Sequence, residues 1–223
     1  MKNHIVGRFV MLLMACLMLG SGNALAQRMT PAQKAANAKR AKELFESTYQ
    51  KVYGAEGSRL TYSVNIIGVF KAMGTIYYKN GKERYDEKKL VVWNNGKKYV
   101  RLNRSKERIE IFDSNDPERN SHSGAMSLNP NNYDYELEIE DGEYKIDLDA
   151  KKNVDGIKHL LLALDVKTQV PKYLKVRWGI FTIKVQLSNI KFGDINDAIF
   201  EFPAEKYKGM ETIDHRIQNN KKR

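Results

Sequence analysis

Hydrophobic residues recur along this chain with two periods, one near its beginning and one through the rest. Between residues 41 and 52 they step by three and one, which puts them on one helical face: Ala41, Leu44, Phe45, Thr48, Tyr49 and Val52. Thr30 and Gln33 have the spacing of a capping box, Pro31 suits the first helical position, and Gly54 is a natural stop. The pattern predicts one amphipathic helix that packs on the rest of the domain.

From Arg59 onward the period changes to two, which is typical of half-buried strands. Asn80-Gly81, Asn95-Gly96 and Asp141-Gly142 are hairpin signals. About eleven strands are predicted, at residues 60–66, 69–78, 90–93, 99–102, 108–112, 135–139, 144–148, 156–164, 173–178, 181–187 and 200–202.

This order of elements predicts a mainly β (α+β) fold, an antiparallel meander with one polar face. A flat sheet with one helix would leave part of its apolar face uncovered. Either the sheet curves around a cavity that the helix partly fills on the concave side, or it closes into a barrel with a full core. Residues 114–132 lack the strand period and form a long loop, which is either a lid or a surface insert. We expect residues 218–223 to be a frayed basic tail.

The first 26 residues have the layout of a secretory signal peptide. Lys2 and Arg8 precede an apolar run over residues 9–20, and Ala24-Leu25-Ala26 offers a cut between Ala26 and Gln27. Leu13-Met14-Ala15-Cys16 also resembles a lipobox, in which Cys16 would be lipidated and the protein anchored to a membrane. We expect the cut after Ala26, because the apolar run has ended there. The expected domains are a cleaved signal (1–26), one globular domain (27–217) and the tail (218–223).

Charge and cysteine content narrow the classes of partner. The formal net charge is +11, yet Lys and Arg are spread through nearly every segment, and export removes cytoplasmic nucleic acid as a partner. Two explanations of the positive charge remain. The basic surface faces anionic lipid or an acidic partner, or it only keeps the protein soluble. Because Cys16 is the only cysteine, the exported domain relies on its hydrophobic core rather than on disulfides.

Candidate catalytic groups are few, so we expect no enzyme, no cofactor and no metal. None of the four histidines has a second histidine or a cysteine at metal-ligand spacing. His122 lies between two serines, but in the most irregular segment of the chain. A row of acids on one strand face either binds calcium or is a solvated outer face; it consists of Asp134, Glu136, Glu138 and Glu140.

Several motifs, in order, resemble the LolA-type periplasmic carriers of lipoproteins. They are a Gly-hydrophobic strand at residues 74–79, a hairpin at residues 90–99 that ends in an aromatic strand, and the closing segments at residues 197–203 and 209–214. The resemblance covers nearly the whole mature chain. It implies an open antiparallel β-barrel of about eleven strands with the N-terminal helix packed on its concave side.

The resemblance also implies a function. Members carry lipoproteins from an inner-membrane ABC transporter to an outer-membrane acceptor, across the periplasm of a Gram-negative bacterium, and hold the acyl chains in an apolar cavity. Burial is worth ~0.8 kcal/mol per CH₂, so exposing a sixteen-carbon chain costs about 12 kcal/mol. We therefore expect a monomeric, non-enzymatic carrier. A sensor or envelope regulator on the same fold is the alternative, or a membrane-anchored receptor if Cys16 is lipidated.

Two departures from the family concern the lid. The family often has Lys-Arg-Pro after its second strand, where the arginine helps to close the lid, but this chain has Lys79-Asn80-Gly81. Arg84 and Arg101 are candidate replacements by position only. A hydrophobic helical plug is replaced by residues 114–132, in which Met126 and Leu128 are the candidate lid residues.

The candidate cavity residues lie on the apolar side of the predicted strands. Each is either ordinary core or an acyl-chain contact: Leu60, Tyr62, Val64, Ile76, Val91, Trp93, Val100, Leu102, Ile109, Ile111, Leu137, Ile139, Ile146, Leu148, Leu162, Leu174, Val176, Val185 and Leu187.

Overall fold

The computed structural model describes residues 29–66, 70–120, 129–154, 157–178 and 181–216. The signal segment with Cys16, Ala26 and Gln27, the lid candidates Met126 and Leu128, His122, and the tail 218–223 lie outside these residues. The chain divides into two compact units, Met1–Lys34 and Ala35–Arg223. In the first unit Thr30 and Gln33 form the predicted capping box. The Thr30 amide donates to Gln33 Oε1 at 2.8 Å, and the Gln33 amide donates to Thr30 Oγ1 at 3.3 Å.

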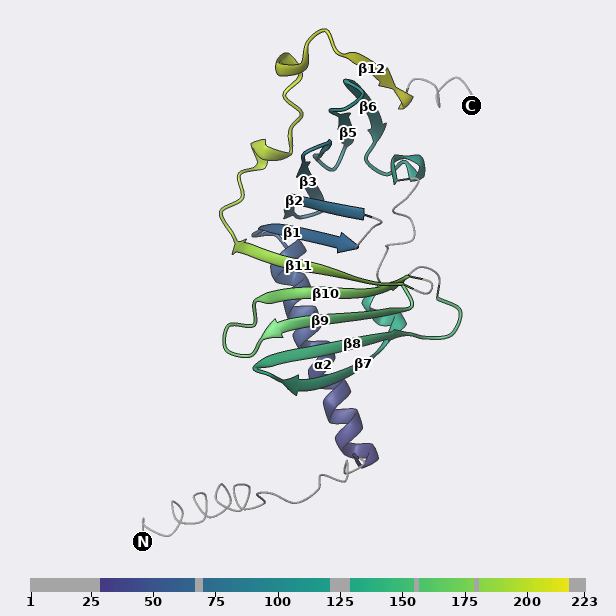
Figure 1. The fold of residues 1–223 in the computed structure, drawn as a ribbon, viewed down its shortest axis with the longest axis vertical. Helices are drawn as coiled ribbons and strands as arrows, with labels where there is room; N and C mark the ends of the chain where they lie inside the picture. The colour runs from purple at the N-terminus through teal and green to yellow at the C-terminus, as the bar shows by residue number, and fades with distance from the viewer. Residues whose placement is uncertain (1–28, 67–69, 121–128, 155–156, 179–180, 217–223) are drawn as a thin grey trace. The chain divides into compact units, whose positions relative to one another are not determined.

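The second unit contains an open sheet of twelve strands, which is mainly antiparallel (Figure 1). Its order is β12-β6-β5-β4-β3-β2-β1-β11-β10-β9-β8-β7, and β12 pairs with β6 in parallel. The strands are β1 (Ser58–Ile66), β2 (Phe70–Lys79), β3 (Lys82–Glu87), β4 (Leu90–Asn94), β5 (Lys98–Asn103), β6 (Arg108–Asp113), β7 (Tyr133–Glu140), β8 (Glu143–Ala150), β9 (His159–Asp165), β10 (Pro171–Trp178), β11 (Phe181–Phe192) and β12 (Glu211–Asp214). The predicted fold class, an open antiparallel sheet with one N-terminal helix, is confirmed.

Three strand predictions differ from the structure. β3 was missed because the sequence Lys-Glu-Arg-Tyr-Asp-Glu contains no alternating apolar residues, and β12 because it has only four residues. No strand forms at residues 200–202. Asn196 instead caps the 3₁₀ helix η4 (Asp197–Phe200), since its side chain accepts from the Ala198 amide at 2.9 Å. In the described part of the chain, the other 3₁₀ helices are η1 (Pro117–Asn120), η3 (Pro130–Asn132) and η5 (Ala204–Tyr207).

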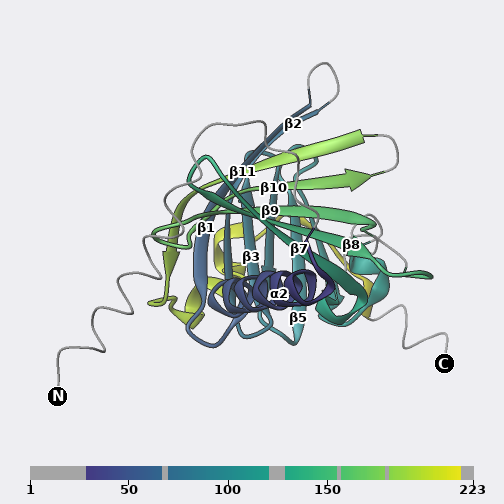
Figure 2. The same ribbon diagram turned by 90° about the horizontal axis from the view of Figure 1, so that it is seen from below.

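The helix α2 (Pro31–Tyr53) has the predicted bounds. Tyr49 of the predicted stripe is half-buried, and the other members are buried: Ala41, Leu44, Phe45, Thr48 and Val52. The helix packs on one face of the sheet (Figures 1 and 2). Asn37 joins the helix to the edge strand β7. Its amide nitrogen donates to the Leu137 carbonyl at 2.8 Å, and its amide oxygen accepts from the Leu137 N–H at 2.8 Å. The helix therefore satisfies backbone groups that an edge strand would otherwise leave unpaired.

The strand register divides the side chains of the sheet between two faces. We call the face that α2 covers the helix face, and the other the opposite face. On the helix face, a core joins α2 to β7, β8 and β9 through buried residues that include Phe45, Ile146 and Leu162. On the opposite face, a second core covers β4, β5 and β6 where the segment after β11 packs on them. Its aromatic centre is Trp93, whose ring centroid lies 5.2 Å from that of Phe202 and 5.9 Å from that of Tyr207.

Candidate functional site: an apolar strip on the helix face

Apolar side chains continue across the helix face beyond the core that α2 buries. On β1, β2, β10 and β11 these side chains are half-buried rather than buried. We call them the apolar strip: Tyr62, Ile66, Ile76, Leu174, Val176, Ile183, Val185 and Leu187. The register joins them on one surface, because Tyr62 pairs with Leu187, Leu174 with Val185, and Val176 with Ile183.

The helix crosses near one end of the strands that carry this strip. Val52 and Ser58 lie close together there, since the Ser58 hydroxyl donates to the Val52 carbonyl at 2.8 Å. β1 then runs on to Ile66, and β11 begins at Phe181, so Ile66, Ile183 and Val185 lie toward the strand ends away from this contact. On β1, Leu60 and Val64 are buried, whereas Tyr62 between them and Ile66 at the strand end are only half-buried. The strip is therefore apolar surface that the helix leaves partly accessible.

On β2 the strip includes Ile76, and the bond from Tyr62 to Glu87 marks its border at β3. The Tyr62 hydroxyl donates to the Glu87 carboxylate, and the Tyr62 ring crosses Gly74, the residue opposite it on β2. A Cβ atom built on Gly74 would lie 2.8 Å from Glu87 Cγ and 3.1 Å from Tyr62 Cε1, so only glycine leaves room for this arrangement. Burial, and then the bond to Glu87, raise the pKa of Tyr62, so the hydroxyl stays neutral and acts as a donor.

Beyond Tyr62, the helix face becomes polar and aromatic on β3 to β6. The Tyr78 and Tyr85 hydroxyls lie 3.0 Å apart, and Tyr85 donates to Glu83 at 3.2 Å. Asn94 donates to the same Glu83 at 3.3 Å. Burial is the main cause that raises the pKa of Tyr85. Because these groups already bond to one another, this part of the face is less suited to an alkyl chain than the strip.

The register separates the predicted cavity residues into two groups. Thirteen lie on the helix face: Leu60, Tyr62, Val64, Ile76, Leu137, Ile139, Ile146, Leu148, Leu162, Leu174, Val176, Val185 and Leu187. The other six lie on the opposite face, under Phe202, Tyr207 and Met210: Val91, Trp93, Val100, Leu102, Ile109 and Ile111. The structure therefore does not bring the two groups together into one cavity.

Burial divides the first group further. Ile146, Leu148 and Leu162 belong to the closed core under α2, whereas Ile139 is 64% exposed near the end of β7. Ile66 and Ile183 belong to the strip but were not among the predicted residues. The period of two could have identified them, because Ile66 continues the series of Tyr62 and Val64.

The two candidate lid arginines lie on different faces. Arg84 is on the opposite face, where its guanidinium bonds Asp86 at 2.9 Å and lies 5.5 Å from the Trp93 ring centre. Arg101 is on the helix face of β5. Its Nε donates to Glu110 at 3.0 Å, and it lies 5.4 Å from the Phe112 ring centre. Of the two arginines, only Arg101 therefore shares a face with the apolar strip. It lies in the polar and aromatic part of that face, on β3 to β6.

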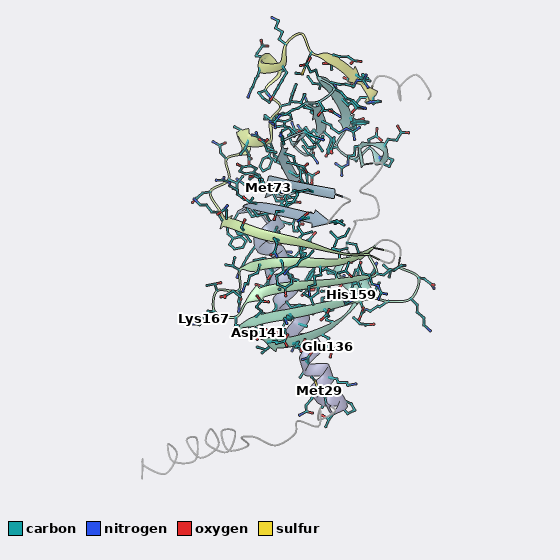
Figure 3. All side chains as sticks on the ribbon, in the orientation of Figure 1. Met29, Met73, Glu136, Asp141, His159 and Lys167 are labelled. Carbon is teal, nitrogen blue, oxygen red and sulfur yellow. The ribbon has the colours of Figure 1, made fainter. Side chains whose placement is uncertain are left out.

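The acidic row of β7 lies exposed on the opposite face. His159 shares that face, at 3.3 Å from Asp147 and 2.8 Å from Asp149 (Figure 3). No group of three or more His, Cys, Asp or Glu residues that could hold a metal ion occurs within the described ranges. Among the same residues, no helix is both long and apolar enough to cross a membrane.

Comparison with known proteins identifies similar folds but gives no activity. No family model and no curated protein sequence matches the chain. An uncharacterized conserved protein from Thermus thermophilus is similar at a TM-score of 0.53 and 11% identity, over 79% of this chain and 99% of that one. A DUF1329 family protein from Desulfovibrio piger gives 0.43 and 12%, over 74% and 97%. A LolA superfamily protein from Nitrosomonas europaea gives 0.37 and 11%, over 73% and 97%.

At these identities the likeness concerns the fold alone, and the two lower scores add nothing to the argument about function. The open sheet and the helix on one of its faces are nevertheless the architecture that the family resemblance implied. The fold of the chain, an open sheet with one helix on a face, is shared with the Thermus thermophilus protein.

Proposed function

We propose that this protein is a non-enzymatic, exported carrier that holds the acyl chains of lipidated proteins against the apolar strip and passes them between membranes. The observation that supports this is the half-buried state of the strip on β1, β2, β10 and β11. Half-buried apolar side chains gain free energy when an alkyl chain covers them, at about 25 cal/mol per Å² of apolar surface. A core that was already closed would offer no such gain.

The strip also suits a cargo that must be released. Its side chains are mostly branched aliphatics, which attract an alkyl chain without fixing its direction. Tyr62 and Glu87 set a polar border on one side, and the closed core under α2 sets the other. Under this proposal the cargo comes from an inner-membrane ABC transporter and is handed to an outer-membrane acceptor, and the carrier acts as a monomer.

A displacement assay tests the proposal. Purified protein, cut after Ala26, should enhance the emission of an apolar naphthylamine fluorophore, and a triacylated lipopeptide should displace it. Intact mass spectrometry of the mature protein checks the cut. Val185→Asp places a charge in the strip and should weaken fluorophore binding at least about tenfold, because a desolvated carboxylate costs more than 1.4 kcal/mol.

The matched control is Gln186→Asp, on the same strand but exposed on the opposite face. Thermal unfolding of both variants separates loss of binding from loss of fold, and Val185→Ser offers a milder change if the aspartate variant unfolds. Equal binding by the folded Val185 and Gln186 variants would contradict the proposal, as would the absence of any fluorophore binding.

A further inference from the structure

A cavity lies away from the strip, on the opposite face. It has a volume of about 600 Å³, and its lining includes Arg59 of β1, Tyr77 of β2, Lys191 of β11, and Asp194, Ile195 and Ile199 of the segment after β11. This size is within the range of small-molecule sites, about 300–1,000 Å³. Since Arg59 pairs with both Tyr77 and Lys191, the sheet floor of the cavity carries two cations and one aromatic ring on adjacent strands.

The two cations of this cavity, Arg59 and Lys191, have no acidic partner among the residues that the structure describes. Arg59 and Lys191 are directly opposed across β1 and β11, an arrangement of like charges that destabilises a sheet. Neither forms an ion pair or a side-chain hydrogen bond with any residue in the described part of the chain, although the Arg59 guanidinium lies 5.7 Å from the Tyr77 ring centre. Asp194 also lines the cavity, but not within ion-pair distance of either cation. The local charge therefore favours an anion.

The outer wall of the cavity is held in place by ion pairs. Lys79 donates to the Ile195 carbonyl at 2.8 Å and lies 3.2 Å from Asp197, which Lys82 also contacts at 2.9 Å. The Gly193 amide donates to the Gly57 carbonyl at 2.8 Å. Because both ends of the wall are tied to the sheet, the cavity exists before any ligand enters, which lowers the cost of binding.

We propose that this cavity binds the headgroup of an anionic phospholipid. The phosphate would lie between Arg59, whose fork of donors matches phosphate oxygens, and Lys191. The glycerol and first acyl carbons would contact Tyr77, Ile195 and Ile199, which a free inorganic anion would leave uncovered. The site is separate from the apolar strip, because Arg59 and Tyr77 lie on the face opposite Tyr62 and Val185. It would let the protein recognise an anionic membrane surface while the other face holds cargo.

Calorimetric titration with monomeric short-chain lipids tests this. The probes are dihexanoyl phosphatidylglycerol, dihexanoyl phosphatidylcholine and inorganic phosphate. Wild-type protein should bind phosphatidylglycerol about tenfold more tightly than phosphatidylcholine, a difference of about 1.4 kcal/mol. Both headgroups offer a phosphate, but the choline cation would lie close to Arg59 and Lys191, which repel it. The double variant Arg59→Gln/Lys191→Gln should lose that preference, and added salt should weaken it in the wild type.

The matched control is Lys175→Gln/Lys184→Gln. These lysines are likewise opposed across β10 and β11, on the same face, but they do not line the cavity. This control should keep the preference. The proposal is overturned if it loses the preference as fully as the cavity variant does, if the cavity variant keeps it while folded, or if inorganic phosphate binds as tightly as phosphatidylglycerol. Val185→Asp should leave the preference between headgroups intact, so failure here is distinguishable from failure of the carrier function.

Discussion

The two halves of the sheet carry their larger apolar cores on different faces. On β7, β8 and β9 the core lies on the helix face under α2, and the opposite face is charged. On β4, β5 and β6 the larger core lies on the opposite face under Phe202 and Tyr207. The helix face of these strands has a smaller core, which includes Tyr99 and Phe112, and the polar Asn94, which bonds Glu83 of β3. The strip lies between these halves, where neither covering segment closes it. Alternation of apolar and polar residues therefore shows that one face of a strand is buried, but it does not show which segment of the chain covers that face.

The largest expected effect comes from breaking the core on the opposite face. Trp93→Ala should lower the free energy of unfolding by about 3–5 kcal/mol, because Trp93 is 2% exposed and packs on Phe202 and Tyr207. Fluorophore binding by the folded fraction should be unchanged, because the strip is on the other face. Denaturant unfolding and titration at low temperature measure both, and a parallel loss of binding affinity would show that the halves are not independent.

Gly74→Ala tests the border between the strip and the polar part of the helix face on β3 to β6. The added methyl would meet Glu87 Cγ at 2.8 Å and the Asp86 carbonyl at 2.9 Å, so we expect a loss of about 1–3 kcal/mol in the free energy of unfolding. Tyr62 should also leave Glu87. Thr75→Ala, on the next residue and the other face, is the control in chemical denaturation. A Gly74 variant as stable as the wild type would refute the close approach of Tyr62.

The helices and strands of this molecule can be predicted from the sequence better than the segments that pack on each face of the sheet. Leu90, Val91, Val92 and Trp93 form a continuous apolar run, and such a run cannot say which of its two faces meets the helix. Only the pairing of Val92 with Tyr85 across the unpredicted strand β3 puts Val92 on the helix face and Trp93 on the other. The six predicted cavity residues on the opposite face all lie beyond that strand, which has a polar sequence without an alternating apolar pattern. Ile66 and Ile183, in contrast, could have been predicted as strip residues from the same period of two along their strands.

Asn37→Ala tests the attachment of α2 to the edge of the sheet. The change removes two hydrogen bonds and leaves the Leu137 backbone groups without a side-chain partner, so stability should fall by about 1–2 kcal/mol. Hydrogen exchange should then accelerate at β7 before it does at β5. Lys39→Ala, whose side chain is 80% exposed on the same helix, should change stability by less than about 0.5 kcal/mol. Equal exchange at β7 in the wild type and the Asn37 variant would contradict this role.

The smallest effect concerns pH and the far end of the sheet. The Arg216 hydrogen bond is the main cause that lowers the pKa of Asp214 on β12. A folded-state pKa below the unfolded one stabilises the fold above the usual aspartate range, and this is lost as the pH falls through the folded value. Asp214→Asn should therefore lose less stability than the wild type between about pH 5 and pH 2, by under about 1 kcal/mol. Urea unfolding measures it, with exposed Asp134→Asn as the control, and parallel pH curves for the wild type and the Asp214 variant would contradict it.

The most direct test asks which face an acyl chain touches. A palmitoyl peptide with a diazirine on its alkyl chain can be photolysed on the mature protein and the adducts mapped by mass spectrometry. The account predicts adducts on the strip, at Val176, Ile183 and Val185, and none at Trp93 or Val100. Adducts concentrated at Trp93 and Val100, or an even spread over the surface that excess unlabelled lipopeptide does not reduce, would contradict it.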